Sequence, residues 1–163
     1  MTNVFHRNPH RQPPIAFDGQ GMYLIDASGK KYIDASGGAA VSCLGHGDPT
    51  VIQAIQEQAE SLAFAHTGFF SSEPAETLAN FLIERAPPNF GKAFFVSGGS
   101  EAVEAALKLA RQYHLDNGEP QRCKFIARRQ SYHGNTLGAL AIGGNEWRRK
   151  QFEPMLFSVS HIS

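Results

Sequence analysis

Two short polar motifs in this sequence combine residue types that bind anionic and aromatic groups. The first is Ser97-Gly98-Gly99-Ser100, which follows the apolar run 93–96 and precedes a helical pattern that begins at Glu101. Backbone N–H groups in the first turn of a helix have no intrahelical acceptor and lie at the positive end of the helix dipole. Glycine lets a phosphate approach such a backbone closely. This pattern predicts a phosphate site, to which the Ser100 hydroxyl can add a hydrogen bond.

The glycine turn has two other interpretations, a plain tight turn and a nucleophile elbow. The two glycines are also typical of a plain tight turn between a strand and a helix. A nucleophile elbow centred on Ser97 is disfavoured, because Phe95 stands where that motif requires glycine. The sequence contains no G-x-x-x-x-G-K-[ST], and no G-x-G-x-x-G follows a strand pattern.

The second motif is Ser131-Tyr132-His133-Gly134, which closes an apolar run at residues 124–127. Ligands of open α/β sheets bind at the carboxyl edge of the strands. A flat aromatic ring there, beside a phosphate site, suits a ligand that has a planar ring and a phosphate arm. Taken singly, Tyr132 is also typical of a half-buried rim residue, and His133 of a hydrogen-bonded structural histidine.

Strands and helices alternate around these motifs. We expect a buried strand at 93–96, a long helix from Glu101 to about His114 and a strand at 124–127. This order predicts a right-handed crossover in a largely parallel sheet, and therefore an α/β fold with the helix mostly buried against the sheet. Glu104 and Lys108 are expected on the polar stripe of that helix, in the favourable i,i+4 order.

The first half of the chain has a different pattern. Residues 1–20 are expected to be an irregular arm, and the runs 22–26 and 31–34 a β-hairpin around a glycine-containing turn. Residues 35–47 are predicted to be a loop. A helix should begin after Asp48 as the capping residue, with Pro49 in the first helical position. It should bury one stripe, formed by Val51, Ile52, Ile55, Ala59, Leu62 and Ala63. A second helix is expected from about Ser72 to the residue before Pro87, after an aromatic connection at 64–70.

The composition narrows the class of protein. Fifteen basic residues balance fifteen acidic ones, so the charge does not indicate a nucleic acid or an anionic membrane as partner. Two cysteines and no signal-like start are typical of a reducing compartment. No apolar run reaches the length needed to span a bilayer. We expect a cytoplasmic protein.

Four ordered blocks of the sequence resemble class III aminotransferases. Phe95 to Arg111 is similar to the phosphate loop and helix of that family, and Ser131 to Leu140 to its second block. Asp34 through the turn Leu44-Gly45-His46-Gly47-Asp48-Pro49 resembles a third block, and residues 23–34 the opening hairpin. The blocks are collinear over nearly the whole chain.

This resemblance implies a PLP-dependent transferase of fold type I, a three-layer αβα structure with a mostly parallel sheet, and a homodimer with active sites at the subunit interface. Residues 1–60 would belong to the small domain and residues 61–163 to the large, pyridoxal 5'-phosphate-binding domain. By position, the cofactor-binding residues would be Gly98, Gly99, Ser100, Tyr132 and His133. The substrate-pocket residues would be Ala40, Phe69 and Phe70, with Ala40 where many relatives have a large aromatic residue.

The resemblance also implies that the Schiff-base lysine and the aspartate that pairs with the pyridine nitrogen lie beyond Ser163. None of the six lysines matches the family's lysine position, so no catalytic residue is assigned in this chain, and the chain by itself should be inactive. The expected reaction of the whole enzyme is amino-group transfer between an amine or amino acid and an oxo acid or aldehyde. The alternatives are an aminomutase, racemase or decarboxylase of the same class, or a non-catalytic domain that acts through its dimer surface.

Overall fold

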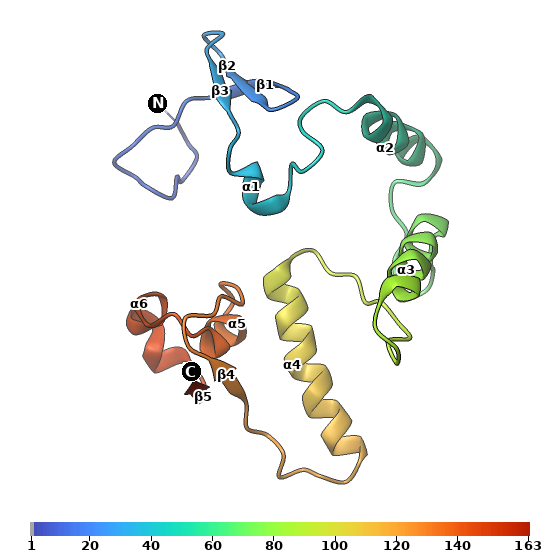
Figure 1. Cartoon of the computed structure of the whole chain (residues 1–163), viewed down its shortest axis with the longest axis vertical. Helices are drawn as coiled ribbons and strands as arrows, with labels where there is room; N and C mark the ends of the chain where they lie inside the picture. The colour runs from blue at the N-terminus through green and yellow to red at the C-terminus, as the bar shows by residue number, and fades with distance from the viewer. Residues whose placement is uncertain (1) are drawn as a thin grey trace. The chain divides into compact units, whose positions relative to one another are not determined.

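The computed structural model describes residues 2–163. These residues form two compact units, one reaching to Glu76 and the other starting at Thr77. Figure 1 labels the helices and strands of both units.

The first unit contains a three-stranded antiparallel sheet of β1 (Ala16–Gln20), β2 (Tyr23–Asp26) and β3 (Lys31–Ile33). The predicted hairpin is confirmed, since β2 pairs with β3 across a turn in which Gly29 has φ +84°. The prediction of an irregular arm over residues 1–20 is wrong from Ala16 onward. The sequence of β1 lacks the alternation typical of a strand, because it includes Gly19 and the polar Asp18 and Gln20. Its pairing with β2 is also interrupted by an irregular register.

Asp26 stabilises the hairpin turn from within. Its carboxylate accepts hydrogen bonds from the backbone N–H groups of Ser28 at 2.8 Å and Lys30 at 3.0 Å, and from the Tyr32 hydroxyl at 2.8 Å. The side-chain hydrogen bonds from Ser28 and Tyr32, followed by the backbone N–H bonds, lower the pKa of Asp26 to about 2. The turn therefore keeps its charged acceptor at any pH near neutral.

Helix α2 (Pro49–Leu62) begins as the sequence predicts. Asp48 is its N-cap, and the Asp48 side chain accepts hydrogen bonds from the N–H groups of Thr50 and Val51. The predicted buried stripe is wrong, because no residue of α2 is buried and Ile55 is 63% exposed. Helix α3 (Glu73–Arg85) has the predicted bounds and also contains no buried residue. The periodicity of both helices marks an apolar face, which the described residues leave uncovered.

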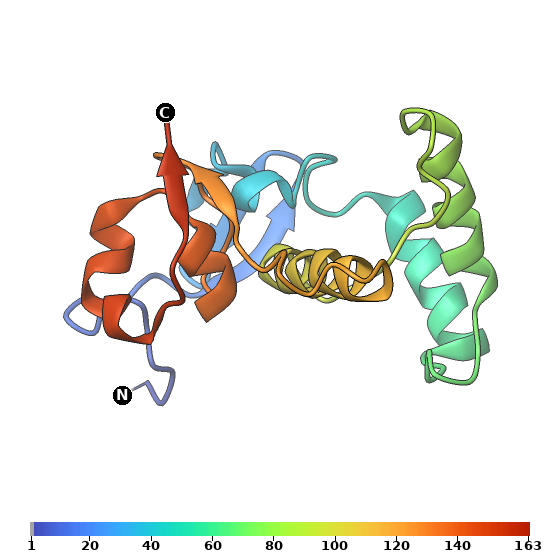
Figure 2. The same ribbon diagram turned by 90° about the horizontal axis from the view of Figure 1, so that it is seen from below.

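The second unit contains the parallel strand pair β4 (Ile126–Arg128) and β5 (Ser160–Ile162), which Figure 2 shows side by side. The strand predicted at 93–96 is absent: these residues form no ladder with any other described residue, and Phe94 is 81% exposed. A short apolar run becomes a strand only when neighbouring strands accept its hydrogen bonds. The predicted strand at 124–127 is present but begins two residues later.

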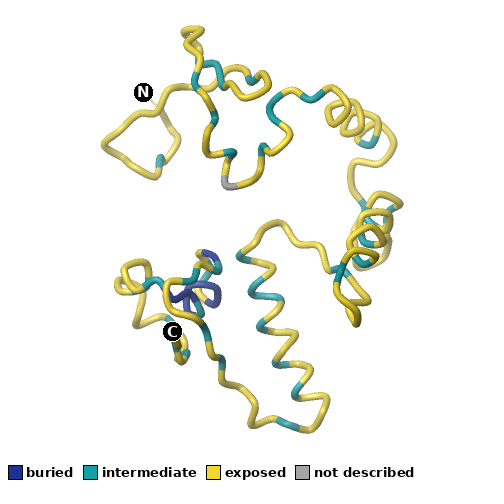
Figure 3. The backbone as a smooth tube through the Cα atoms, in the orientation of Figure 1, coloured by how far each residue is buried: buried dark blue, intermediate teal, exposed yellow. Residues whose placement is uncertain are grey.

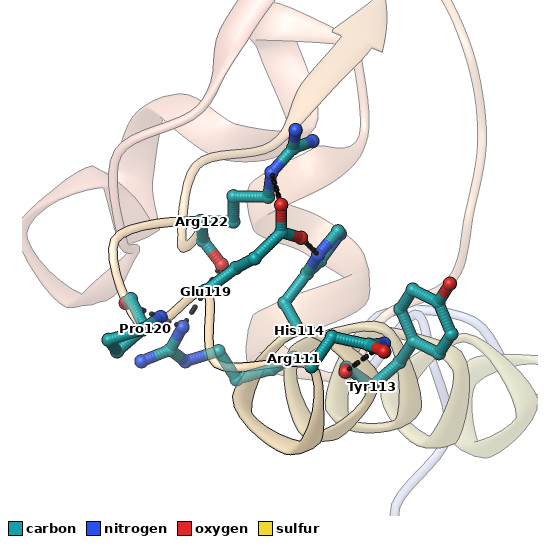
Figure 4. A network of polar contacts seen from close by, with 7 residues as sticks. Arg111, Tyr113, His114, Glu119, Pro120 and Arg122 are labelled. Atoms are coloured by element: carbon teal, nitrogen blue, oxygen red, sulfur yellow. Dashed lines mark hydrogen bonds and ion pairs between the residues drawn. The ribbon is translucent and has the colours of Figure 1, made fainter.

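Helix α4 (Gly99–Asp116) is the long helix that the sequence predicts. Its burial against a sheet is not observed, since none of its residues is buried. A polar network closes the connection after it (Figure 4): Arg111 donates to the carbonyl oxygens of Pro120 at 2.8 Å and Arg122 at 3.0 Å. Glu119 contacts both His114 at 2.8 Å and Arg122 at 3.1 Å.

Three short helices follow: α5 (Leu137–Ile142), α6 (Glu146–Arg149) and the 3₁₀ helix η1 (Lys150–Met155). The buried hydrophobic side chains of the described residues are Ala139, Leu140 and Ala141, all on α5. They coincide with the short dark stretch of Figure 3. In the part of the chain that the structure describes, no helix is both long and apolar enough to cross a membrane.

The accessible surface of the chain is far larger than that of a compact protein of this mass. It measures 13869 Å², whereas one compact monomer of 17.8 kDa exposes about 8,000 Å² and two separate domains of half that mass expose about 9,600 Å² together. The excess includes many large apolar side chains on α2, α3 and the 93–96 segment. No residue of these three segments is buried.

We therefore predict that the 163-residue chain, expressed alone, binds a hydrophobic dye strongly and self-associates, because it exposes contiguous apolar faces. Dye fluorescence and analytical ultracentrifugation measure this directly. A monodisperse monomer that melts cooperatively would contradict it.

Candidate functional site

The start of α4 offers three backbone donors. Gly98 is the N-cap, and the first intrahelical hydrogen bond runs from the N–H of Ala102 to the carbonyl oxygen of Gly98 at 3.0 Å. The N–H groups of Gly99, Ser100 and Glu101 therefore precede the helical hydrogen-bond ladder and have no acceptor among the described residues. Together with the helix dipole, they favour an anion at this end of α4.

The two glycines of the turn have open space beside them. A Cβ atom built on Gly98 or Gly99 would meet no other atom within 4 Å. The neighbouring carboxylate of Glu101 is already bound, because it accepts a hydrogen bond from the N–H of Ser97 at 2.9 Å. The glycine turn thus has both the donors and the room that a phosphate group requires.

The segment that contains the second sequence motif lies directly against the first turn of α4. The Ser100 hydroxyl accepts a hydrogen bond from the N–H of Asn135 at 3.0 Å and donates one to Asn135 Oδ1 at 3.1 Å. Gly134 is buried beside it with φ +135°, and a Cβ there would lie 2.9 Å from Ser100 Cα. The structure therefore brings the glycine turn and the Tyr132-containing turn together through Ser100.

One helical turn further along α4, Glu104 caps the next helix. Its carboxylate oxygen Oε1 accepts hydrogen bonds from the N–H groups of Gly138 at 2.8 Å and Ala139 at 3.2 Å, in the first turn of α5. Thr136 is the N-cap residue of α5 but makes no capping hydrogen bond with its own side chain. Glu104 thus performs across two helices the role that an N-cap side chain normally has within one.

The environment of Glu104 favours its charged form. The nearby Thr136 hydroxyl, then the N–H groups of Ala139 and Gly138, and last the charge of Lys108 lower the pKa of Glu104, although partial burial opposes this. A Cβ on Gly138 would lie 2.7 Å from Glu104 Oε1 and 2.8 Å from Cδ. Glycine at this position is what lets the carboxylate reach the backbone of α5.

Tyr132 and His133 follow the turn after β4. The N–H of Gly144 donates to both the carbonyl oxygen and the hydroxyl of Ser131, at 3.1 Å each, and this fixes one end of the turn. Tyr132 is 64% exposed, with the Arg148 guanidinium carbon 5.1 Å from its ring centroid. His133 is half-buried.

The three predicted substrate-pocket residues belong to the first unit. Ala40 ends the short helix α1 (Gly37–Ala40), a helix within the predicted loop, and it has a left-handed backbone with φ +70°. Phe69 and Phe70 are exposed, and the N–H groups of both bond to the carbonyl oxygen of His66, at 3.0 and 3.1 Å.

Asp34 organises the loop that contains Ala40. Its carboxylate accepts hydrogen bonds from the Ser42 hydroxyl at 2.9 Å and the Gly37 N–H at 3.1 Å, and it lies 2.9 Å from His46 Nε2. The Ser42 hydroxyl and then His46 are the main causes that lower the pKa of Asp34. The small residues around Ala40 thus sit in a loop held by an ionised carboxylate.

The interhelical role of Glu104 is not evident from the sequence, which predicts a surface stripe with Lys108. Its partners Gly138 and Ala139 lie 34 and 35 residues further along the chain, so no local pattern indicates the contact. Asn135, the partner of Ser100, is missed for the same reason.

Comparisons with known proteins identify the family of this chain. The family model "Aminotransferase class-III" matches residues 5–163. An uncharacterized aminotransferase of Schizosaccharomyces pombe is 46% identical over 161 residues, which cover 98% of this chain and 35% of that protein. Acetylornithine aminotransferase of Clostridium acetobutylicum is 35% identical, and the match covers 99% of this chain and 41% of that protein.

Solved structures show the same fold. Adenosylmethionine-8-amino-7-oxononanoate aminotransferase of Methanocaldococcus jannaschii superimposes with a TM-score of 0.89 at 34% identity, over 98% of this chain and 38% of that one. The omega transaminase of Pseudomonas jessenii in complex with PMP gives a TM-score of 0.87 at 31% identity, over 97% and 37% of the two chains.

The chain belongs to the class III aminotransferase family. The predicted α/β class, as part of the PLP-dependent transferase fold type I, is confirmed by these structural neighbours. The chain spans roughly 35% to 41% of the length of the relatives described above.

The contact between Gly138 and Glu104 leads to a prediction for the full-length protein encoded by the reading frame that contains this chain. Gly138→Ala should lower its free energy of unfolding by about 0.5–2 kcal/mol, because the added methyl group would displace the Glu104 carboxylate from the N–H groups that it caps. Gly91→Ala is the matched control, since a Cβ at Gly91 meets nothing within 4 Å. Equal melting temperatures for the two variants would contradict the close packing of α4 on α5.

Proposed function

We propose that this chain is the N-terminal part of a pyridoxal 5'-phosphate-dependent aminotransferase. The enzyme would transfer an amino group between an amine or amino acid and an oxo acid or aldehyde. The observation that carries the proposal is the family match over residues 5–163, combined with an α4 N-terminus that has three unpaired amides and open space beside Gly98 and Gly99.

The residues present suit the phosphate of this cofactor. The N–H groups of Gly99 and Ser100 would hold it, aided by the helix dipole, and Gly98 would leave it room. The single hydroxyl proton of Ser100 is directed to Asn135, so its contribution to the phosphate would come from the backbone N–H. These donors bind and orient the cofactor; they do not transfer protons.

Tyr132 would stack on the pyridine ring, and His133 would lie beside it. This role is supported by the attachment of Gly134 and Asn135 to Ser100, which keeps the turn next to the phosphate site. When bound, PLP supplies an electron sink for negative charge at the substrate carbon. The chain's own contribution is binding, orientation and shielding of the ring face.

We assign no proton-transfer group to this chain. The lysine that binds the cofactor covalently and the aspartate that pairs with the pyridine nitrogen would lie beyond Ser163. We propose a cytoplasmic homodimer, with residues 1–60 in the small domain and 61–163 in the large domain. The amino donor would be a small molecule, and an oxo acid would be the acceptor. An aminomutase, racemase or decarboxylase on the same scaffold is the alternative, because fold does not determine reaction type.

We further propose that the intact enzyme accepts a bulky amino donor. The loop Ser36-Gly37-Gly38-Ala39-Ala40-Val41 has only small side chains where many relatives of the family have a large ring. An engineered omega transaminase in which a tryptophan is replaced by glycine was made for the synthesis of bulky amines. Phe69 and Phe70 are the candidates for the wall opposite this loop.

The first test is covalent labelling. The 163-residue chain is incubated with PLP and reduced with borohydride, and the label is mapped by mass spectrometry. We expect no stoichiometric, site-specific label on any of its six lysines and no transaminase activity, whereas the full-length protein should carry one label on a lysine downstream of Ser163. A single stoichiometric label within residues 1–163 would contradict the assignment.

The second test is substrate size. Ala40→Trp in the full-length protein should lower kcat/KM for a bulky amine relative to a small one, by an amount equivalent to about 1–3 kcal/mol, because apolar pocket contacts discriminate weakly. Because φ at Ala40 is +70°, a bulky residue there also strains the backbone. Val41→Trp is the matched control at an ordinary φ. If both substrates are affected equally by Ala40→Trp, Ala40 does not line the substrate pocket.

A further inference from the structure

We propose that Glu104 is a positioning residue for the cofactor site, because it fixes the Tyr132-containing turn relative to the amides of α4. The proposal rests on the proposed function. It assigns to Glu104 an action through Gly138, Ala139 and the turn before them, with no contact to substrate or cofactor.

The first observation is the cap itself. The two N–H groups in the first turn of α5 that an N-cap side chain normally binds both donate to Glu104, at 2.8 and 3.2 Å. The charge of the carboxylate lies at the positive end of α5, where an anion is favoured. Since Thr136 provides no capping bond of its own, the start of α5 depends on a side chain from α4.

The second observation concerns residues 135–139: Ser100 holds the start of this segment, and Glu104 holds its end. Ser100 and Glu104 are one turn apart on α4 and therefore share a face. Ser100 holds Asn135 through two hydrogen bonds, and Glu104 holds Gly138 and Ala139. Residues 135–139 are thus attached to α4 at two points, and their position along the α4 axis is determined.

The third observation is the absence of slack between the two segments. Gly134 and Gly138 are buried, and neither has room for a Cβ, because atoms of Ser100 and Glu104 occupy that space. The two segments are therefore closely packed: the Glu104 carboxylate lies against Gly138, and Ser100 lies against Gly134.

Tyr132 depends on these attachments for its position. Its side chain is mostly exposed, and the aromatic contact that the structure records for it is the Arg148 guanidinium, itself exposed. The turn is fixed by Ser131 on one side and by Asn135 on the other. Loss of the Glu104 cap on α5 should therefore loosen the attachment at Asn135. The Tyr132 ring could then leave the position in which it would stack on the pyridine ring of the cofactor.

The experiment uses the full-length protein with Glu104→Ala and Glu104→Gln, and with Glu84→Ala as the matched control at an exposed carboxylate on α3. The measurements are the dissociation constant for PLP and the visible circular dichroism of the bound cofactor, which reports on the ring's surroundings. Hydrogen exchange of the peptide covering 131–139 is measured without PLP. The full-length protein is the wild-type reference.

We expect Glu104→Ala to weaken PLP binding by about tenfold, the effect of losing a helix cap. Its dichroism band should shrink and exchange at 134–139 should rise. Glu104→Gln keeps an oxygen acceptor without the charge and should lie between Glu104→Ala and wild type, while Glu84→Ala matches wild type. If Glu104→Ala does not fold, Glu104→Gln decides alone.

Variants that bind PLP with wild-type affinity, dichroism and exchange would overturn the role of Glu104 and leave the proposed function standing. A wild-type full-length protein that binds no PLP would instead contradict the proposed function itself. Faster exchange with unchanged affinity and dichroism would show a structural cap only, and would also overturn the positioning role.

Discussion

The contact between α4 and the start of α5 is the interaction on which the second unit depends. Within residues 2–163, the buried hydrophobic side chains all lie on α5, and Glu104 accepts hydrogen bonds from the N–H groups of Gly138 and Ala139 in the first turn of that helix. A charged cap at a helix N-terminus contributes about 0.5–2 kcal/mol in typical proteins. Here the contact is also close, because a Cβ at Gly134 or Gly138 would overlap atoms of Ser100 or Glu104.

The candidate site at the start of α4 lies one helical turn from this contact. The three unpaired amides exist because any α-helix leaves its first N–H groups without acceptors. What is particular to this chain is that Ser100, inside that first turn, also bonds the segment after Tyr132. One helix end thus both presents the anion donors and attaches the aromatic turn. Elsewhere the chain exposes apolar faces on α2, α3 and residues 93–96, and under the proposed function the rest of the enzyme covers them.

Local signals made part of the fold predictable. The cap at Asp48 and the hairpin turn at Gly29 depend on residues close in sequence, so their patterns are sufficient. The strand at 93–96 was predicted from apolarity, yet a strand requires hydrogen-bonding neighbours that the described residues do not provide. The stripe on α2 has the periodicity of a buried face, but burial depends on what packs against it.

In the candidate site, too, some features depend on residues close in sequence and others on distant residues. The glycine turn and Tyr132 can be proposed from the sequence because each motif is contiguous, and the family resemblance implies a joint role for them. Glu104 was expected on a solvated stripe, because its partners lie 34 and 35 residues away. No local pattern encodes such a distant contact.

The central claim is that the start of α4 and the Tyr132 turn form one cofactor site. A crystal structure of the full-length protein with PLP tests it most directly. We expect phosphate oxygens within about 3.2 Å of the backbone nitrogens of Gly99 and Ser100, with the Tyr132 ring stacked on the pyridine ring. A phosphate bound elsewhere, or a Tyr132 ring turned away from the cofactor, would contradict it.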